Sequence, residues 1–321
     1  MIVGNLAILF NILSILVLTI VSMIFVVSII IKLRLNKLAH YSVLSRRRVL
    51  WILALSPWVI GILTAFLAII SDSHYLPLPT SFNFLHWHHI QEFNFESWHG
   101  LSVITAAIYI CLIVASKLYR LFKKNRQINS LRAFAEVDES GFYQLEADAA
   151  TAFTAGYFNP NCYITSALRL ELTPDEYQVL QLHEREHARR SDPLKKWFYQ
   201  LLTAFFPKNI SEKLNRSMSL VIEQCADQAI LNVVEDKSLI ATTLLKVNRL
   251  ACRSFKGVLE DESFCYYAVN HIEERINYLL IEQQSKVFSH YSTFLVTVSG
   301  TLICALSADF FHHFIESALS H

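Results

Sequence analysis

The sequence predicts an α-helical integral membrane protein with a mainly helical (α+β) domain on its cytoplasmic side. Its 321 residues are 53% hydrophobic and 17% charged, whereas an ordinary soluble domain has about 25% charged residues. Apolar runs of the length that crosses a bilayer, about 20 residues, flank one long polar segment. The net charge of +1 lacks the basic surplus of a nucleic-acid-binding protein, so direct nucleic-acid binding is not expected.

Four segments are predicted to be transmembrane helices. The first three are about residues 5–31, 49–70 and 98–116. With an external loop at 71–97 they form a membrane domain over residues 1–122. The fourth covers about 287–306, in a C-terminal region (287–321) that ends as a short external tail. No basic residues precede the first span, and its apolar core is longer than that of a signal peptide, so we expect it to be retained.

Basic residues set the orientation of these spans, because they gather in cytoplasmic loops. The loop after the first span has six basic residues and no acidic ones: Lys32, Arg34, Lys37, Arg46, Arg47 and Arg48. The loop at 71–97 contains neither Lys nor Arg, and the third span is followed by another basic group: Lys117, Arg120, Lys123, Lys124 and Arg126. Both termini are therefore predicted outside, and residues 123–286 in the cytoplasm.

The cytoplasmic segment begins with short alternating stretches. They lie at 142–149, 151–158 and 162–165, with a turn at FNPN, and they predict a small antiparallel sheet. A helix follows in ELTPDEYQVLQLHEREHARR. Thr173 can cap it, Pro174 suits its first position, and Glu176 completes a capping box. The stretch WFYQLLTAFF (197–206) is too short to span and is either an interfacial or re-entrant segment or a core helix.

The predicted helix carries HEREH, a candidate metal-binding motif. His183 and His187 lie one turn apart and point the same way, as two ligands of one metal ion can. Catalytic zinc normally takes three protein ligands, and Glu223, in EQCAD (223–227) on another predicted helix, is the third candidate. Asp227 can hydrogen-bond a ligating imidazole and fix its tautomer. HExxH alone often marks only a charged helix surface, so the hypothesis depends on both motifs together.

With these motifs the chain resembles the BlaR/MecR-type integral membrane zinc metallopeptidases, antirepressor relatives of the HtpX-type gluzincins. The resemblance is carried by AFTAGYFNPNCYITSAL, HEREHARRSDP, EQCAD and HIEERINYLL, and by a gluzincin domain placed between the third and fourth spans. It implies Zn²⁺ as cofactor, held by His183, His187 and Glu223. It also implies Glu184 as general base and Asp227 as a hydrogen-bond partner of the ligands. The penicillin-binding sensor domain of the antibiotic sensors is lacking, so β-lactam sensing through it is not expected.

The residues alone do not choose the general base. At 100° per residue, Glu184 and Glu186 each lie about 80° from the midpoint of the two histidines. Only the resemblance selects Glu184. Arg275, in EERINYLL, either contacts the site or is a charge on a helix surface.

The resemblance implies a multi-pass endopeptidase of the bacterial inner membrane, with lipid bilayer around its spans and an active site facing the cytoplasm. Its substrate would be a cytosolic protein, a transcriptional repressor of the BlaI/MecI kind, and a homodimer is compatible with this role. The extended AFTAGYF segment either offers a strand edge to the substrate or packs under the helix. Two alternatives stay open: an HtpX-type protease for membrane-protein quality control, with many substrates, and a non-catalytic membrane receptor. The intact HExxH and EQCAD motifs argue against the receptor.

The external loop is rich in histidine: His74, His86, His88 and His89 lie in it, and His99 follows it. Histidine ligates transition metals and titrates near neutral pH, which suggests a sensor. A short aromatic loop lying along the bilayer interface explains the same composition, and we favour that interpretation.

Overall fold

The computed structural model describes residues 2–72, 91–255, 262–281, 287–289, 291 and 298–304. These residues are mostly helical, with two small sheets. Three of the described helical segments are long and apolar enough to cross a membrane: 5–40, 43–70 and 98–133. The predicted fourth span at 287–306 lies partly outside the described residues, so the count of four remains a prediction.

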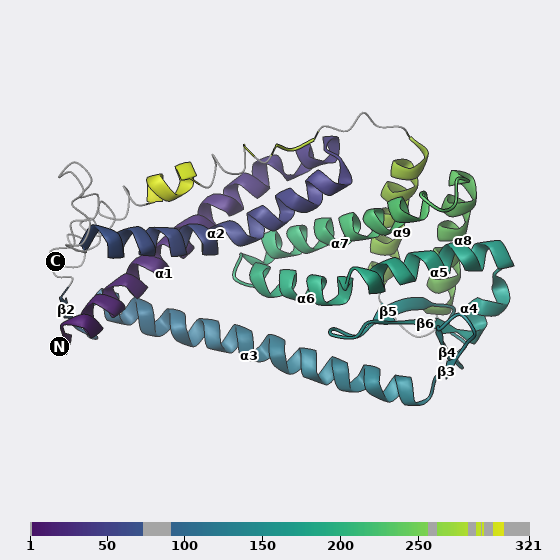
Figure 1. Ribbon diagram of the computed structural model, residues 1–321, viewed down its shortest axis with the longest axis horizontal. Coiled ribbons are helices and arrows are strands. Elements are labelled where there is room, and N and C mark those ends of the chain that lie inside the picture. Colours follow the sequence, from purple (N-terminus) through teal and green to yellow (C-terminus); the bar gives the residue numbers. More distant parts are fainter. Residues whose placement is uncertain are drawn as a thin grey trace.

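The first two long helices form a closely packed pair. α1 (Asn5–Arg34) leads through the short helix η1 (Leu35–His40) into α2 (Val43–Asp72), which runs back beside it (Figure 1). The contact is close at Gly61, where a Cβ atom would lie 2.8 Å from the side chain of Ile20. Any larger residue at this position would therefore push the two helices apart.

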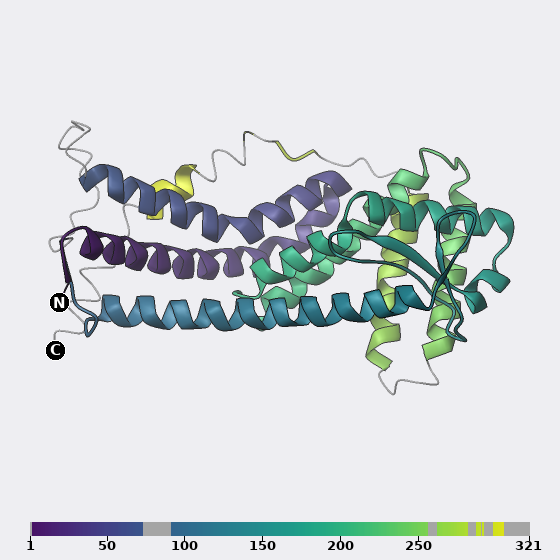
Figure 2. The ribbon, with the colours of Figure 1, turned by 60° about the horizontal axis from the view of Figure 1, so that its bottom comes forward.

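The third long helix, α3 (Trp98–Ala133), is continuous over 36 residues, or about 54 Å at 1.5 Å per residue. Ser97 caps its first turn by accepting a hydrogen bond from the backbone N–H of Gly100. It runs from the end of the molecule that holds the N-terminus to the larger sheet (Figures 1 and 2). The position at which the sequence places the start of the cytoplasmic domain, residue 123, lies within this unbroken helix.

The larger sheet has four strands in the order β3-β4-β6-β5. Their bounds are Glu136–Val137 (β3), Tyr143–Leu145 (β4), Ala152–Ala155 (β5) and Asn161–Thr165 (β6). The predicted hairpin around FNPN is confirmed as the antiparallel pair β5–β6. The prediction of a purely antiparallel sheet is wrong, because β6 pairs with β4 in parallel. β5 lies between β4 and β6 in the sequence but at the edge of the sheet in space. β6 runs antiparallel to β5 and parallel to β4.

The remaining helices form the rest of the domain at the sheet end. They are α4 (Ser166–Glu171), α5 (Pro174–Arg189), α6 (Asp192–Thr203), α7 (Lys208–Ile230), α8 (Lys237–Phe255) and α9 (Glu262–Leu280). The predicted capping box of α5 is confirmed: the Thr173 side chain accepts from the N–H of Glu176, and the Glu176 side chain accepts from that of Thr173. A second small sheet, β1 (Ile2–Val3) with β2 (Glu92–Phe93), lies near the N-terminus.

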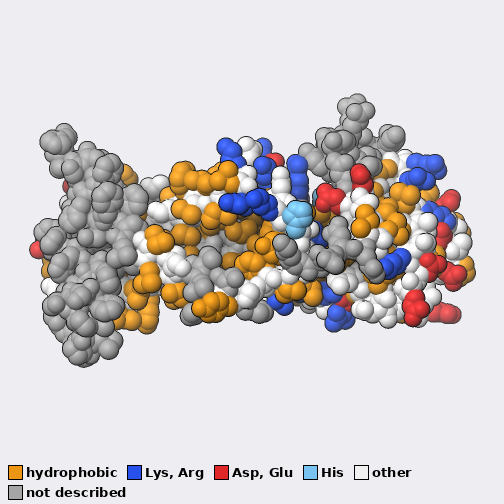
Figure 3. Space-filling model, turned by 90° about the horizontal axis from the view of Figure 1, so that it is seen from above, with side chains coloured by type: hydrophobic (Ala, Val, Ile, Leu, Met, Phe, Trp, Pro, Cys, Tyr) orange, Lys and Arg blue, Asp and Glu red, His pale blue; other side chains and the backbone are white. Residues whose placement is uncertain are grey.

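The hairpin of α6 and α7 connects this domain with the long helices. It lies between α2 and α3 in Figure 1, and its tip carries Phe205, whose ring packs edge-on against Trp58 of α2 and Tyr109 of α3. Tyr199 of α6 is buried and donates to the backbone oxygen of Leu50. The stretch WFYQLLTAFF is therefore the second half of α6, up to Thr203, followed by a turn, and it packs against the candidate spans. On one face of the molecule, apolar side chains gather over the long helices and most acidic side chains over the other end (Figure 3).

Candidate metal centre

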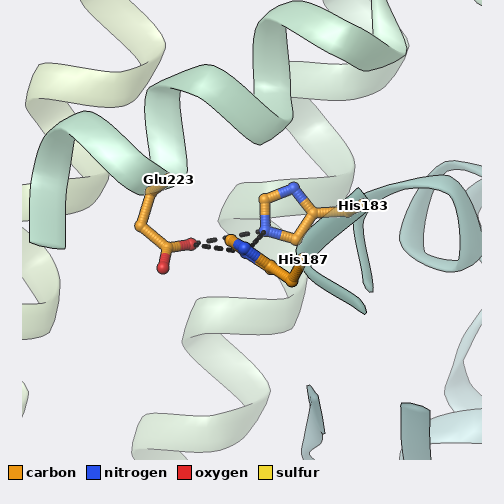
Figure 4. A group of neighbouring side chains, drawn as sticks. All are labelled: His183, His187 and Glu223. Atoms are coloured by element: carbon orange, nitrogen blue, oxygen red, sulfur yellow. Dashed lines mark hydrogen bonds and ion pairs between the residues drawn. The ribbon is translucent and has the colours of Figure 1, made fainter. Parts of the chain in front are cut away.

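The two histidines of HEREH meet Glu223 in a buried cluster. α5 carries His183 and His187 on one face, and α7 passes across that face with Glu223. The three side chains point at one another (Figure 4). The Nε2 atoms of the two histidines are 3.2 Å apart, and Oε2 of Glu223 lies 3.3 Å from that of His183 and 3.5 Å from that of His187.

These separations fit a metal ion. Ligands about 2.0–2.1 Å from a tetrahedral zinc ion stand about 3.3–3.4 Å from one another, which is close to the three distances in the cluster. The donor set of two imidazoles and one carboxylate suits zinc and other divalent first-row metals. In the described part of the chain, His183, His187 and Glu223 are the one group of such side chains placed to share a metal ion.

Asp192 fixes the orientation of His187, although sequence reasoning did not identify it. Its Oδ2 accepts a hydrogen bond of 2.7 Å from Nδ1 of His187. With the proton on Nδ1, the lone pair of a neutral ring is at Nε2, which faces the other two ligands. The contact depends on Ser191, whose left-handed backbone (φ 53°) ends α5 and directs α6 so that Asp192 returns to the histidine.

Asp227 lies on the other side of the cluster, beside His183, as the sequence led us to expect. Its Oδ1 is 3.2 Å from Nδ1 of His183, although the orientation of the two groups does not make this contact a hydrogen bond. Both carboxylate oxygens of Asp227 accept from Arg275 of α9, at 2.7 and 2.8 Å. Arg275, for which the sequence left two interpretations open, is therefore a half-buried partner of the site.

Opposite charges lie close together in the cluster and shift one another's pKa values. Burial raises the pKa of the Glu223 carboxyl, but the charges of Lys196 and His187 outweigh it and hold that pKa well below its ordinary value. Burial lowers the pKa of His187, yet the Glu223 charge and the hydrogen bond to Asp192 raise it to about 10. The pKa of Lys196 is also raised, because the charge of Glu223 outweighs burial. Glu223 is thus held as a carboxylate, the form that can ligate a metal ion.

The structure separates the two glutamates of HEREH. Glu184 lines the same cleft as His187 and Glu223, and its Oε2 lies 2.7 Å from the hydroxyl of Thr154. The Glu186 carboxylate is instead occupied by its neighbours on the helix, with hydrogen bonds of 2.7 Å from Arg189 and an ion pair with Arg190. Glu184 is therefore the carboxylate of this pair that can reach a molecule in the cleft.

The cleft has a volume of about 640 Å³ and is open to solvent. The cleft is lined by Thr154 of the edge strand β5 and by the C-terminal part of α3, with Lys124, Gln127, Ile128 and Leu131. Lys196 and Trp197 of α6 line it as well. A cleft bordered by a strand edge suits an extended peptide chain. No sequence signal linked α3 to the site, because apolar periodicity does not show which distant element a helix face meets.

Of the five histidines in or after the predicted external loop, only His99 lies in the described part of the chain. His74, His86, His88 and His89 lie outside the described residues, so the sensor hypothesis stays a prediction. His99 is buried near the start of α3, and its backbone oxygen accepts from the hydroxyl of Ser14 in α1.

Compared with known protein families and with curated proteins, the chain matches no family and no individual protein. The geometry of the site and the motifs in the sequence are therefore what indicate its function.

Proposed function

We propose that the chain is a membrane-bound zinc endopeptidase whose active site faces the cytoplasm. The supporting observation is the convergence of His183, His187 and Glu223 at mutual distances of 3.2–3.5 Å, beside a cleft that Glu184 also lines. Catalytic zinc sites take three protein ligands of this kind and keep one position for water.

Each side chain then has a defined task. His183, His187 and Glu223 would hold the zinc ion, and when bound it would supply the Lewis acidity that lowers the pKa of a water to about 7 and polarises a carbonyl. Glu184 accepts the proton of the attacking water and delivers it to the leaving nitrogen, while the Thr154 hydroxyl holds the Glu184 carboxylate toward the cleft. Asp192 holds the ring of His187 in place. The free edge of β5 pairs with the backbone of the peptide.

The test is to purify the whole chain in mild detergent and to measure bound zinc and peptide cleavage together. The wild type is expected to hold one zinc ion per chain and to cut peptides. His187→Ala should lose the metal, whereas Glu184→Gln should keep the metal and lose cleavage. Full zinc in His187→Ala, together with full cleavage by Glu184→Gln, would refute the assignment.

The resemblance favours a cytosolic transcriptional repressor as the substrate, so that cleavage transmits a signal. Mapping of cytosolic cleavage products, in cells with the wild type and with Glu184→Gln, distinguishes one cut regulator from many cut proteins.

The position of the cleft favours a second candidate, quality control of membrane proteins. Lys117 marks the cytoplasmic end of the third predicted span, and Lys124, which lines the cleft, follows it by about 10 Å of helix. Substrate segments that emerge from the bilayer thus come within reach. Cleavage of many misfolded membrane proteins, with cytosolic proteins intact, would support this candidate.

The proposal places the protein in the bacterial inner membrane with both termini outside, as the basic loops predict. Reporter fusions check this orientation: a fusion after residue 40 should report from the cytoplasm, and one within 71–97 from the outside.

A further inference from the structure

Lys196 is a cation inside the cleft that the proposed mechanism does not use. It lies on α6, and its ammonium donates a hydrogen bond of 3.0 Å to Oε1 of Glu223. The other oxygen of this carboxylate, Oε2, faces the two histidines. The Lys196 side chain is 33% exposed and lines the cleft together with Glu184. It is therefore both next to a metal ligand and open to a bound molecule.

The other cations nearby are placed differently. Arg275 reaches Glu223 at 3.5 Å, but its guanidinium is bound to both oxygens of Asp227, and it is not one of the residues that line the cleft. Lys124 lines the cleft from α3, but among the described residues it forms no ion pair with Glu223. Within the described part of the chain, Lys196 is the cation that combines contact with the ligand triad and access to the cleft.

The ammonium of Lys196 has donors to spare. It carries three N–H groups, and the described residues offer it one hydrogen-bond acceptor, Oε1 of Glu223. That bond fixes the position of the nitrogen without using up its donors. A negatively charged oxygen arriving in the cleft would meet a cation that is already in place, and such preorganised groups stabilise a transition state most.

We propose that Lys196 is the group that stabilises the oxyanion formed during peptide hydrolysis, an inference that rests on the proposed function. Water adds to the carbonyl carbon and gives a proton to Glu184, while the π electron pair of the C=O bond moves onto the oxygen. Lys196 donates a hydrogen bond to this oxyanion. The pair then returns to re-form the C=O bond, the C–N bond breaks, and the proton passes from Glu184 to the leaving nitrogen.

The test compares Lys196→Met, Lys196→Arg and Lys195→Met in the full-length protein. Lys195 is the neighbouring lysine on α6, is exposed and does not line the cleft, so it is a matched control. Bound zinc is measured by elemental analysis, and kcat and KM with a quenched fluorescent peptide that the wild type cuts. Affinity for a phosphonamidate of the same peptide, an anionic tetrahedral mimic of the intermediate, is measured by calorimetry.

Lys196→Met is expected to keep its zinc and its KM, to lose about 10²–10³-fold in kcat, and to bind the phosphonamidate more weakly by a similar factor. Lys196→Arg should recover part of both losses because it keeps the positive charge, and Lys195→Met should behave as the wild type.

Three results overturn the inference while leaving the proposed function intact. They are an unchanged kcat in Lys196→Met, a loss confined to KM, and a loss of zinc that accounts for the lost activity, since the lysine would then only hold Glu223. A wild-type chain that binds no zinc and cuts nothing overturns the proposed function and this inference with it.

Discussion

Nδ1 of His187 and Oδ2 of Asp192 are joined by a hydrogen bond of 2.7 Å, although the chain leaves one helix and begins another between them. The left-handed residue Ser191 provides the change of direction. Because the bond holds the ring with Nε2 toward His183 and Glu223, the geometry of the centre depends on the junction of α5 and α6 as well as on HEREH.

Replacement of Asp192 by asparagine should weaken metal binding. The amide is a weaker acceptor than the carboxylate and can present a donor to Nδ1, so the imidazole loses basicity and its fixed tautomer. Removing such a partner typically lowers metal affinity about 10–100-fold. Zinc affinity, measured by competition with a chelator, checks this, and Asp148→Asn is the control because Asp148 is exposed. Equal zinc affinities in the two variants would contradict the role of Asp192.

The two glutamates of HEREH should respond oppositely to substitution. Glu184→Gln should keep zinc and lose peptide cleavage by at least about 10²-fold, since general-base catalysis contributes about that factor or more. Glu186→Gln should keep cleavage but lower the melting temperature, because it weakens the contacts of the carboxylate with Arg189 and Arg190. Loss of cleavage in Glu186→Gln with cleavage intact in Glu184→Gln would reverse the assignment.

The stability of the domain should fall in acid through Asp138. Burial raises the pKa of this carboxyl, but hydrogen bonds from Ser140, Tyr177 and the backbone N–H of Phe142 outweigh it and lower the pKa below its ordinary 3.8. Because its pKa is lower in the folded state, the Asp138 carboxylate contributes its full stabilisation of the fold above about pH 3.8. This stabilisation is lost as the pH falls through the pKa of the folded state.

Asp138→Asn should therefore destabilise the protein at pH 7, by about 1 kcal/mol, and by less at pH 3. Thermal unfolding at the two pH values measures the difference. The control is Glu139→Gln, because Glu139 is the exposed neighbour of Asp138. No such change is expected for this variant. A constant difference between wild type and Asp138→Asn at both pH values would show that the carboxylate charge is not responsible.

Replacement of Gly156, in the hairpin that borders the cleft, should strongly lower the stability of the protein. Its φ is +108°, and a Cβ atom would lie 2.5 Å from the backbone oxygen of Asn159. Gly156→Ala should cost about 3 kcal/mol or more, since strain and overlap add. Gly141→Ala is the matched case, with φ +82° and open space around the new methyl group, and it should cost about 1–2 kcal/mol. Melting temperatures of the two variants in detergent check the order, and a smaller loss for Gly156→Ala would contradict it.

Local signals were enough to predict α5 and the β5–β6 hairpin. Thr173, Pro174 and Glu176 act within one turn of helix, and the turn at FNPN acts within four residues, so short stretches of sequence carry the information. The parallel pairing of β4 with β6 was not predictable in this way, because it joins strands that are separated by a third.

The candidate site was likewise predictable only in part. The placement of His183 and His187 on one helix face follows from helical periodicity, and their meeting with Glu223 was anticipated from paired motifs. Asp192 and Lys196 were missed because their approach depends on the backbone of Ser191, a non-glycine residue in a conformation that sequence rarely reveals. α3 lines the cleft only because it continues beyond residue 123, where the sequence has no signal that ends a helix.

The continuity of α3 joins the cleft to a helix that is long and apolar enough to cross a membrane. The helix contacts α6 where the indole N–H of Trp197 donates to the backbone oxygen of Lys117, and Leu131, which lines the cleft, lies about 21 Å further along. Between these two points, Ile128 packs against Ala155 and Tyr163 of the sheet. A fragment that begins at residue 134 would retain the metal ligands but lack the side of the cleft that α3 provides.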